Sequence, residues 1–158
     1  MAELAPSPAA GSRTASSGPP LAGAPKMLVI ATLLCSYPGI DATGQAHMEY
    51  PPSTYVIPTP DPVMFSERFY LYAFERGIDG ILIASCGTDS PYEGSYEQLA
   101  ARVNVVYRLM RERGLDVRRL KLTSICSVCT KAFVKEVEAM TAVLGEIGPV
   151  ERPLAVSS

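Results

Sequence analysis

The chain has 158 residues, of which 47% are hydrophobic and 19% charged, a composition typical of a globular protein. Its formal net charge of −2 gives no overall basic field, which argues against nucleic acid as a partner. The longest apolar run, residues 27–35, is about half of what a membrane span requires, and it lacks the flanks of a signal peptide. We therefore expect a cytoplasmic protein without a membrane partner, whose four cysteines serve metal binding or redox chemistry rather than structural disulfides.

The two ends of the chain differ in composition from its centre. Residues 1–26 are mostly Ala, Pro, Gly and Ser and include no aromatic residue, so they cannot bury enough apolar surface to offset the entropy of ordering them. Residues 148–158 contain two prolines and show no hydrophobic periodicity. We predict a disordered leader over 1–26, one folded domain over 27–147 and a flexible tail over 148–158.

The first half of the domain alternates strand and helix patterns. Residues 27–34 are almost continuously apolar, which is typical of a strand buried on both faces of a parallel sheet. A short helix is predicted over 39–49 and a short strand over 54–57, where prolines follow. An Asp-Pro pair then gives a typical helix start, because Asp is a good N-cap and proline fits the first helical position. That second helix is predicted over 61–76.

The second half of the domain continues the alternation. Residues 79–85 and 120–125 are predicted as two further strands. Apolar residues recur every three or four positions over 95–113, a helical pattern that Gly114 closes, and the same spacing predicts a last helix over 127–147. Four strand–helix units with short connections predict an α/β fold, a small flavodoxin-like or Rossmann-like sandwich. Its four-stranded, mostly parallel sheet would carry helices on both faces.

All four cysteines follow predicted strands. Cys35 ends the first strand, Cys86 ends the third and Cys126 ends the fourth, with Cys129 one turn into the last helix. Sites in an open α/β sheet form beyond the carboxyl ends of the strands, so we expect these thiols along one edge of the sheet. Four thiolates are also the number that a 2Fe–2S or 4Fe–4S cluster requires.

The residues alone leave three other interpretations of the cysteines open. A buried cysteine is often only a small apolar side chain. Cys126 and Cys129 have CxxC spacing at a strand-to-helix junction, where a helix N-terminus lowers thiol pKa values, so they could form a redox dithiol. Zinc is the third possibility, although the second cysteine pair of a zinc ribbon is missing.

Four short motifs follow one another along the predicted domain: Cys-Ser-Tyr-Pro-Gly at 35–39, Met-Glu-Tyr-Pro-Pro at 48–52, Ile-Ala-Ser-Cys at 83–86 and Tyr-Glu-Gly-Ser-Tyr at 92–96. In this order they resemble the methyl-viologen-reducing hydrogenase delta subunit family of hydrogenase iron–sulfur subunits, over residues 28–147. The resemblance implies a flavodoxin-like subunit with a 2Fe–2S cluster. Such a subunit passes electrons between a hydrogenase or dehydrogenase partner and a heterodisulfide-reductase-like flavoprotein. It also implies that Cys35 and Cys86 match family ligand positions.

The cysteine pattern departs from that of the family at three places. Thr32 stands where the family usually has the first cysteine of a CxxC pair. Family cysteines are also missing after the second strand, at 58–60, and shortly after Cys86, at 88–90. Either the cluster is rebuilt with a different ligand set, or it has been lost and the subunit is kept as a scaffold.

The count of four cysteines favours a rebuilt cluster. We predict an electron-transfer subunit, not catalytic by itself, that holds a 2Fe–2S cluster through Cys35, Cys86, Cys126 and Cys129. One alternative is a cluster-free adaptor that contacts its partners through the aromatic side chains of the 61–76 helix. Another is a dithiol oxidoreductase that uses Cys126 and Cys129.

Overall fold

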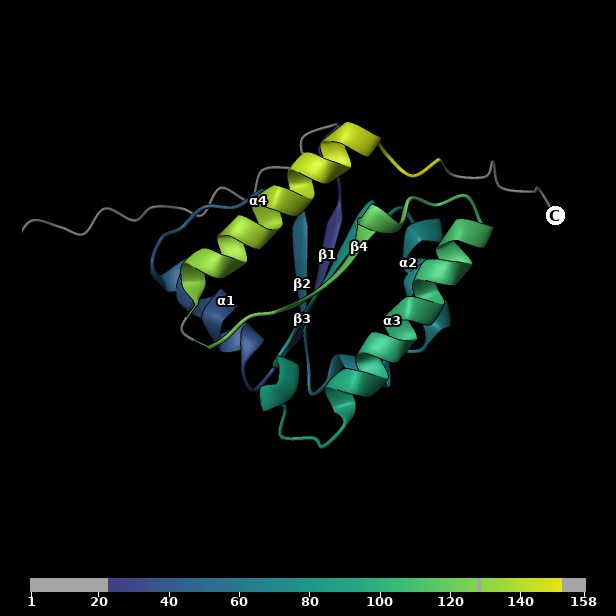
Figure 1. The fold of residues 1–158 in the computed structure, drawn as a ribbon. Coiled ribbons are helices and arrows are strands. Elements are labelled where there is room, and N and C mark those ends of the chain that lie inside the picture. The colour runs from purple at the N-terminus through teal and green to yellow at the C-terminus, as the bar shows by residue number, and fades with distance from the viewer. Residues whose placement is uncertain (1–22, 128, 152–158) are drawn as a thin grey trace, which may run out of the picture.

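The computed structural model describes residues 23–127 and 129–151 (Figure 1). The strands are β1 (Met27–Thr32), β2 (Thr54–Thr59), β3 (Gly80–Ser85) and β4 (Leu120–Ser124). The helices are α1 (Ser36–Gln45), α2 (Glu67–Glu75), α3 (Ser95–Glu112) and α4 (Thr130–Ile147). Three short 3-10 turns are η1 (Pro62–Met64), η2 (Gly87–Asp89) and η3 (Val117–Arg119). The strands pair in the order β2-β1-β3-β4, all parallel, which confirms the predicted α/β fold.

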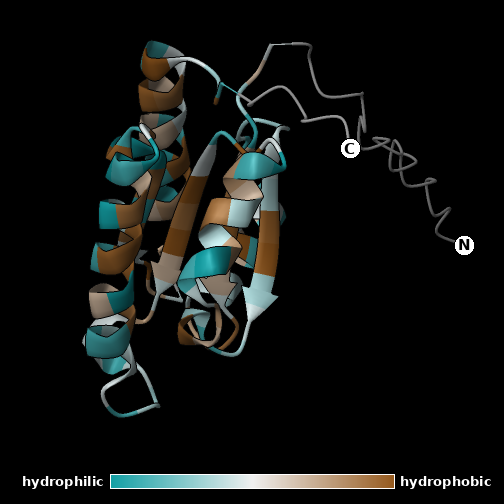
Figure 2. Ribbon diagram, turned by 90° about the vertical axis from the view of Figure 1, so that its right-hand side faces the viewer, coloured by the Kyte–Doolittle hydropathy of each residue, from teal (hydrophilic) through white to brown (hydrophobic). Residues whose placement is uncertain are grey.

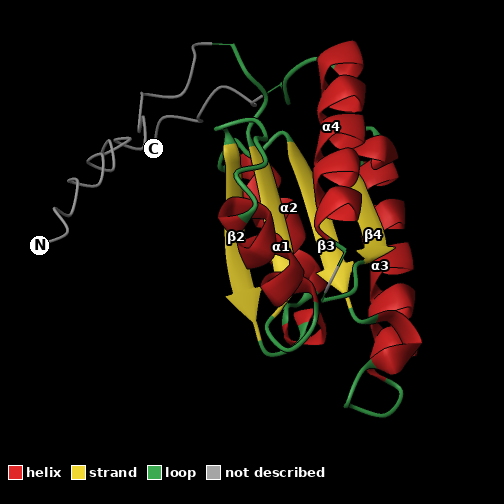
Figure 3. Cartoon of the chain, turned by 90° about the vertical axis from the view of Figure 1, so that its left-hand side faces the viewer, coloured by secondary structure: helices red, strands yellow, loops and turns green. Residues whose placement is uncertain are grey.

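Helices cover both faces of the sheet. Figures 1 and 3 show α1 and α4 on one face and α2 and α3 on the other. Every residue of β1 and β3 is buried, as their apolar sequences predict for central strands. Successive residues serve opposite faces: Val29 shares a core cluster with Phe133 of α4, whereas Ile30 shares one with Tyr70 of α2. Each such side chain gains about 1.5–3 kcal/mol from burial. In Figure 2 the strands are brown along much of their length, and the helices carry both brown and teal residues.

The predicted helix over 61–76 is divided in the structure, and this is a correction. Asp61 does cap a helical turn, because its carboxylate accepts a hydrogen bond from Val63 N at 2.9 Å. The chain is then extended at Phe65, and the α-helix begins only at Glu67. The Arg102 guanidinium from α3 donates to the carbonyls of Val63 and Phe65, so those carbonyls are satisfied without a continuous helix.

The aromatic residues around α2 belong mainly to the core. Tyr70 and Phe74 are buried, and Phe65 and Phe69 stack with ring centroids 4.3 Å apart while packing against the same core cluster. Tyr72, which is 49% exposed, is the one aromatic side chain of α2 that lies on the surface within the described residues. The aromatic partner surface expected for an adaptor is therefore largely absent from α2.

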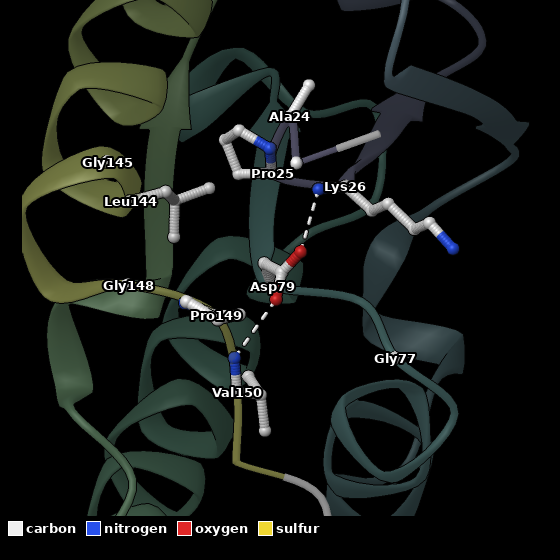
Figure 4. Close-up of a pocket in the computed structure, with 11 residues that line it drawn as sticks. Ala24, Pro25, Lys26, Gly77, Asp79, Leu144, Gly145, Gly148, Pro149 and Val150 are labelled. Atoms are coloured by element: carbon white, nitrogen blue, oxygen red, sulfur yellow. Dashed lines mark hydrogen bonds between the residues drawn. The ribbon is translucent and has the colours of Figure 1, made fainter. Parts of the chain in front are cut away.

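Residues that flank the predicted domain pack against it at the amino end of the sheet. Asp79 accepts hydrogen bonds from Lys26 N at 2.9 Å and from Val150 N at 3.0 Å, so one carboxylate joins both flanks (Figure 4). The rest of the predicted leader and tail, residues 1–22 and 152–158, lies outside the described residues. In the part of the chain that is described, no helix has the length and apolar character needed to cross a membrane.

Candidate redox site at the carboxyl edge of the sheet

The candidate site lies at the carboxyl ends of β1 and β3, where the connections that follow the two strands go to opposite faces of the sheet. β1 leads into α1 on one face, whereas its neighbour β3 leads into α3 on the opposite face. In open α/β sheets such a switch point leaves a crevice beyond the carboxyl ends of the two strands, where ligands bind. Cys35 lies at the N-cap of α1 and Cys86 directly follows β3, so both cysteines lie at this point.

Cys35 and Cys86 form a disulfide across the switch point. Their Cα atoms are 5.8 Å apart, and both residues are partly buried. They are brought together by the register of the two strands, since Ala31 on β1 is the partner of Ala84 on β3. The adjacency of β1 and β3 therefore pairs two cysteines that are 51 positions apart in the sequence.

Cys126 and Cys129 form a second disulfide between β4 and α4. Their Cα atoms are 5.2 Å apart, and Cys129 is the N-cap residue of α4. Cys126 is exposed, whereas Cys129 is partly buried and packs against the core cluster beneath α4. The second pair is thus the more accessible of the two, and it lies at a helix N-terminus, where the helix dipole favours the thiolate.

Ser36 ties together the chain segments that carry the two pairs. Its hydroxyl is fully buried and shares its single proton between the carbonyl oxygens of Ser85 and Ile125, each 3.1 Å from Oγ. These carbonyls belong to the residues immediately before Cys86 and Cys126, and Ser36 itself follows Cys35. In addition, Ile125 N donates to Ser85 O at 3.2 Å, which extends the β3–β4 pairing to the cysteines. Three of the four cysteines are therefore one residue away from a single hydrogen-bonded junction.

The four cysteines match the protein ligands of a 2Fe–2S cluster in number and in residue type. Each iron of such a cluster takes two protein ligands, and the chain supplies two pairs of cysteines. Within residues 23–127 and 129–151, no three His, Cys, Asp or Glu side chains are grouped so that they could hold a metal ion. A cysteine in a disulfide cannot act as a ligand, because the thiolate is the species that binds metal. Both disulfides must therefore be reduced before the four sulfurs can bind iron.

The structure brings the four predicted ligands together as two separate pairs. The structure places Cys35 beside Cys86 and Cys126 beside Cys129, all at the carboxyl edge of the sheet. A single cluster shared by all four remains a prediction. Thr32, where the family resemblance predicts a cysteine, is buried and donates its hydroxyl to Ala84 O at 3.3 Å, so it supports the strand pairing.

Sequence reasoning did not identify Ser36 as part of the site. A serine that follows a cysteine is common, and the two carbonyls that it contacts lie 49 and 89 residues further along the chain. A signal was present, because Ser36 falls on the same helical face as Ile40, which is buried. This spacing predicts that Ser36 is buried, but it does not identify the groups that the Ser36 hydroxyl contacts.

Comparison with known proteins identifies relatives over nearly the whole described domain. The sequence model of the family "methyl-viologen-reducing hydrogenase, delta subunit" matches residues 27–148. An iron-sulfur subunit of the F420-non-reducing hydrogenase of Archaeoglobus profundus is 28% identical over 127 residues, which are 79% of this chain and 92% of that protein. The corresponding iron-sulfur subunit of the vhc F420-non-reducing hydrogenase from Methanococcus voltae is 31% identical over 97 residues, covering 61% of this chain and 67% of the relative.

A second group of relatives is much longer than this chain. One of them, a subunit of the ferredoxin:CoB-CoM heterodisulfide reductase of Methanosarcina mazei, is 31% identical over 118 residues. The match covers 73% of this chain but only 15% of that relative. The chain therefore corresponds to one small part of these longer proteins.

Proposed function

The chain belongs to the methyl-viologen-reducing hydrogenase delta subunit family, and on that premise we propose that it is an electron-transfer subunit carrying a 2Fe–2S cluster. The observation that supports this proposal best is the arrangement of the cysteines. Two pairs of cysteines, each joined as a disulfide, lie at the carboxyl edge of the sheet, and one pair spans the switch point between β1 and β3. No other cysteine is present in the sequence to compete for iron.

The pairs have different environments, which gives them different parts in the proposed site. Cys35 and Cys86, which are both partly buried, would hold one iron, and Cys126 and Cys129 would hold the other. When bound, the cluster supplies one-electron transfer. Ser36 fixes the position of the thiolates through its contacts with the segments that carry them. Partial burial limits the access of water to Cys35 and Cys86, the inner pair. Cys126 is exposed, so it leaves Cys126 and Cys129, the outer pair, open to a partner protein.

We further propose that its partners are redox subunits. The names of its relatives point to two kinds, a hydrogenase subunit and a heterodisulfide-reductase-like subunit. In the longer relatives the matching stretch is part of a heterodisulfide reductase chain, which supports direct contact with a subunit of that type. The chain would relay electrons between these two partners and perform no chemistry alone.

Iron analysis of protein purified without oxygen and with a thiol reductant tests the proposal. We expect about two irons per chain and the visible absorption of a thiolate-bound cluster. Cys126→Ser should lower the iron content, whereas Ser127→Ala, a change at the next position of the same exposed loop, should leave it unchanged. A colourless, iron-free protein would overturn the proposal, and a Cys126→Ser variant with the full cluster would overturn the ligand set.

A dithiol oxidoreductase is the second candidate, and the exposed Cys126–Cys129 disulfide favours it. Reduction of this disulfide would take two electrons and two protons from an external dithiol, which would become a disulfide in turn. For this function we expect rapid exchange with a small dithiol in protein that holds no iron. Slow exchange at the Cys126–Cys129 pair, no faster than at Cys35–Cys86, would exclude it.

A further inference from the structure

We propose that Gly39 is a positioning residue that seats the Cys126–Cys129 loop against α1, beside the Cys35–Cys86 pair. The inference rests on the proposed function in so far as the two pairs act as one site. It concerns a residue that carries no chemistry of its own, and its support comes from the packing of α1.

Helix α1 turns one buried face toward this loop, and apart from Ile40 its residues are small. Its buried residues are spaced by three and four positions, so they share one face: Ser36, Gly39, Ile40 and Thr43. Cys35 immediately precedes this face, and α1 has no buried aromatic residue that would keep a neighbouring segment at a distance. The helix can therefore approach a backbone segment closely.

The contacts on this face follow the loop in order. The Ser36 hydroxyl lies 3.1 Å from Ile125 O. Seven residues later the Thr43 hydroxyl, which donates to Gly39 O at 2.9 Å, lies 3.4 Å from Thr130 O. Between them, a Cβ placed on Gly39 would lie only 2.7 Å from Cys126 O and 3.4 Å from Ser127 O. One face of α1 thus lies along the backbone from β4 to α4, and the closest approach is at a cysteine of the outer pair.

The requirement for glycine at position 39 comes from this close approach. Gly39 is in the middle of a helix, where glycine is disfavoured relative to alanine, and its φ is not positive. The atom that a Cβ would meet belongs to the backbone, so it cannot move aside without displacing the loop. Because Cys126 is the residue concerned, any added side chain moves the outer thiols relative to the inner ones.

The same helix contains a matched control. Gly44 also lies in α1, and a Cβ added there would meet nothing within 4 Å. Gly39→Ala and Gly44→Ala therefore make the same chemical change, each replacing a helical glycine by a better helix former, and only the first disturbs the loop. A difference between the two variants isolates the contact with Cys126.

Two measurements on the full chain test the proposal. In the iron-loaded protein, Gly39→Ala should lose iron to a chelator faster than the parent, since mutation of residues that orient metal ligands weakens metal binding about 10- to 100-fold. In iron-free protein, dithiothreitol should reduce the Cys126–Cys129 disulfide several-fold faster in Gly39→Ala, because the displaced loop is more accessible. Gly44→Ala should match the parent in both measurements.

The outcomes separate this inference from the proposed function. If the parent holds iron and Gly39→Ala behaves as Gly44→Ala does, the inference is overturned and the electron-transfer proposal stands. If the parent holds no iron, the electron-transfer proposal fails, and the disulfide reduction rates alone decide the role of Gly39. Should Gly39→Ala not fold, Ser36→Ala replaces it, since it removes the neighbouring hydroxyl contact without adding volume. That variant should shift the same two rates in the same direction, and unchanged rates would overturn the proposal.

Discussion

Replacement of tyrosine by phenylalanine should change the free energy of unfolding in opposite directions at Tyr70 and at Tyr107. Tyr70 is fully buried, and its phenol oxygen has no hydrogen-bond partner in the described parts of the chain. Tyr107 is partly buried, and its hydroxyl donates to Leu120 O at 3.0 Å. Replacement by phenylalanine removes the same atom at both positions, so the two variants differ in whether a hydrogen bond is lost.

The expected magnitudes follow from the environment of each hydroxyl. A buried polar group without a partner costs about 1–3 kcal/mol, so Tyr70→Phe should raise the free energy of unfolding by about 1 kcal/mol or more. A satisfied hydrogen bond contributes about 0.5–1.5 kcal/mol, so Tyr107→Phe should lower that free energy by about 1 kcal/mol. The two variants should therefore differ by about 2 kcal/mol in opposite directions from the parent.

Tyr70 should also make the free energy of unfolding depend on pH. Burial, only partly opposed by the positive charge of Arg102, raises the pKa of Tyr70 from 10.0 to about 12. The phenol then ionises more easily in the unfolded chain, so the stability due to this shift is complete below about pH 10 and declines as the pH rises toward 12. The decline would reach about 3 kcal/mol, at 1.36 kcal/mol for each pKa unit. Tyr70→Phe should reduce it, leaving the smaller contribution of Tyr107, whose pKa burial also raises.

Urea unfolding of the parent and both variants, at pH 7 and at pH 10.5, measures these effects. The three proteins should be prepared with equal iron content, since bound metal stabilises the folded state. The reasoning is refuted if Tyr70→Phe destabilises the protein at pH 7 as much as Tyr107→Phe does. That result would mean that the Tyr70 hydroxyl has a partner, such as a buried water.

Two further predictions concern the amino end of the sheet. Arg119 is buried and donates to the carbonyls of Asp79, Gly148 and two residues beside Gly148, so Arg119→Ala should lower the free energy of unfolding by about 3 kcal/mol. Arg118→Ala, at the exposed neighbouring position, should have little effect, and equal losses in urea unfolding would contradict the assignment. Asp79→Ala should release both flanks of the domain, and hydrogen exchange should show faster exchange at the amides of Lys26 and Val150, while unchanged rates would contradict this role.

The fold could be predicted from the sequence because its central strands are buried on both faces. The residues of β1 and β3 form apolar runs typical of interior parallel strands, and α3 and α4 have clear helical periodicity. The start of α2 could not be predicted in this way. It depends on Arg102, which lies on another helix and satisfies carbonyls 37 and 39 residues earlier in the chain. Local signals at the Asp-Pro pair do not contain that contact.

The candidate site was predictable only in part. The position of each cysteine after a strand follows from local patterns, so their common edge could be predicted. Which cysteines pair depends on the strand order β2-β1-β3-β4, which sets β1 beside β3. The roles of Ser36 and Gly39 depend on backbone atoms near Cys126, which approach α1 only in the folded chain. Sequence patterns that report burial cannot supply such long-range contacts.

Electron paramagnetic resonance of the reduced protein, purified without oxygen, tests the central claim most directly. If the four cysteines hold one 2Fe–2S cluster, the reduced parent should show the signal of a single cluster, at about one spin per chain. The signal should be lost or altered when either Cys35 or Cys126 is replaced by serine, because each pair would hold one iron. A parent protein that gives no signal and contains no iron would contradict the account. So would a signal that the loss of Cys126 leaves unchanged.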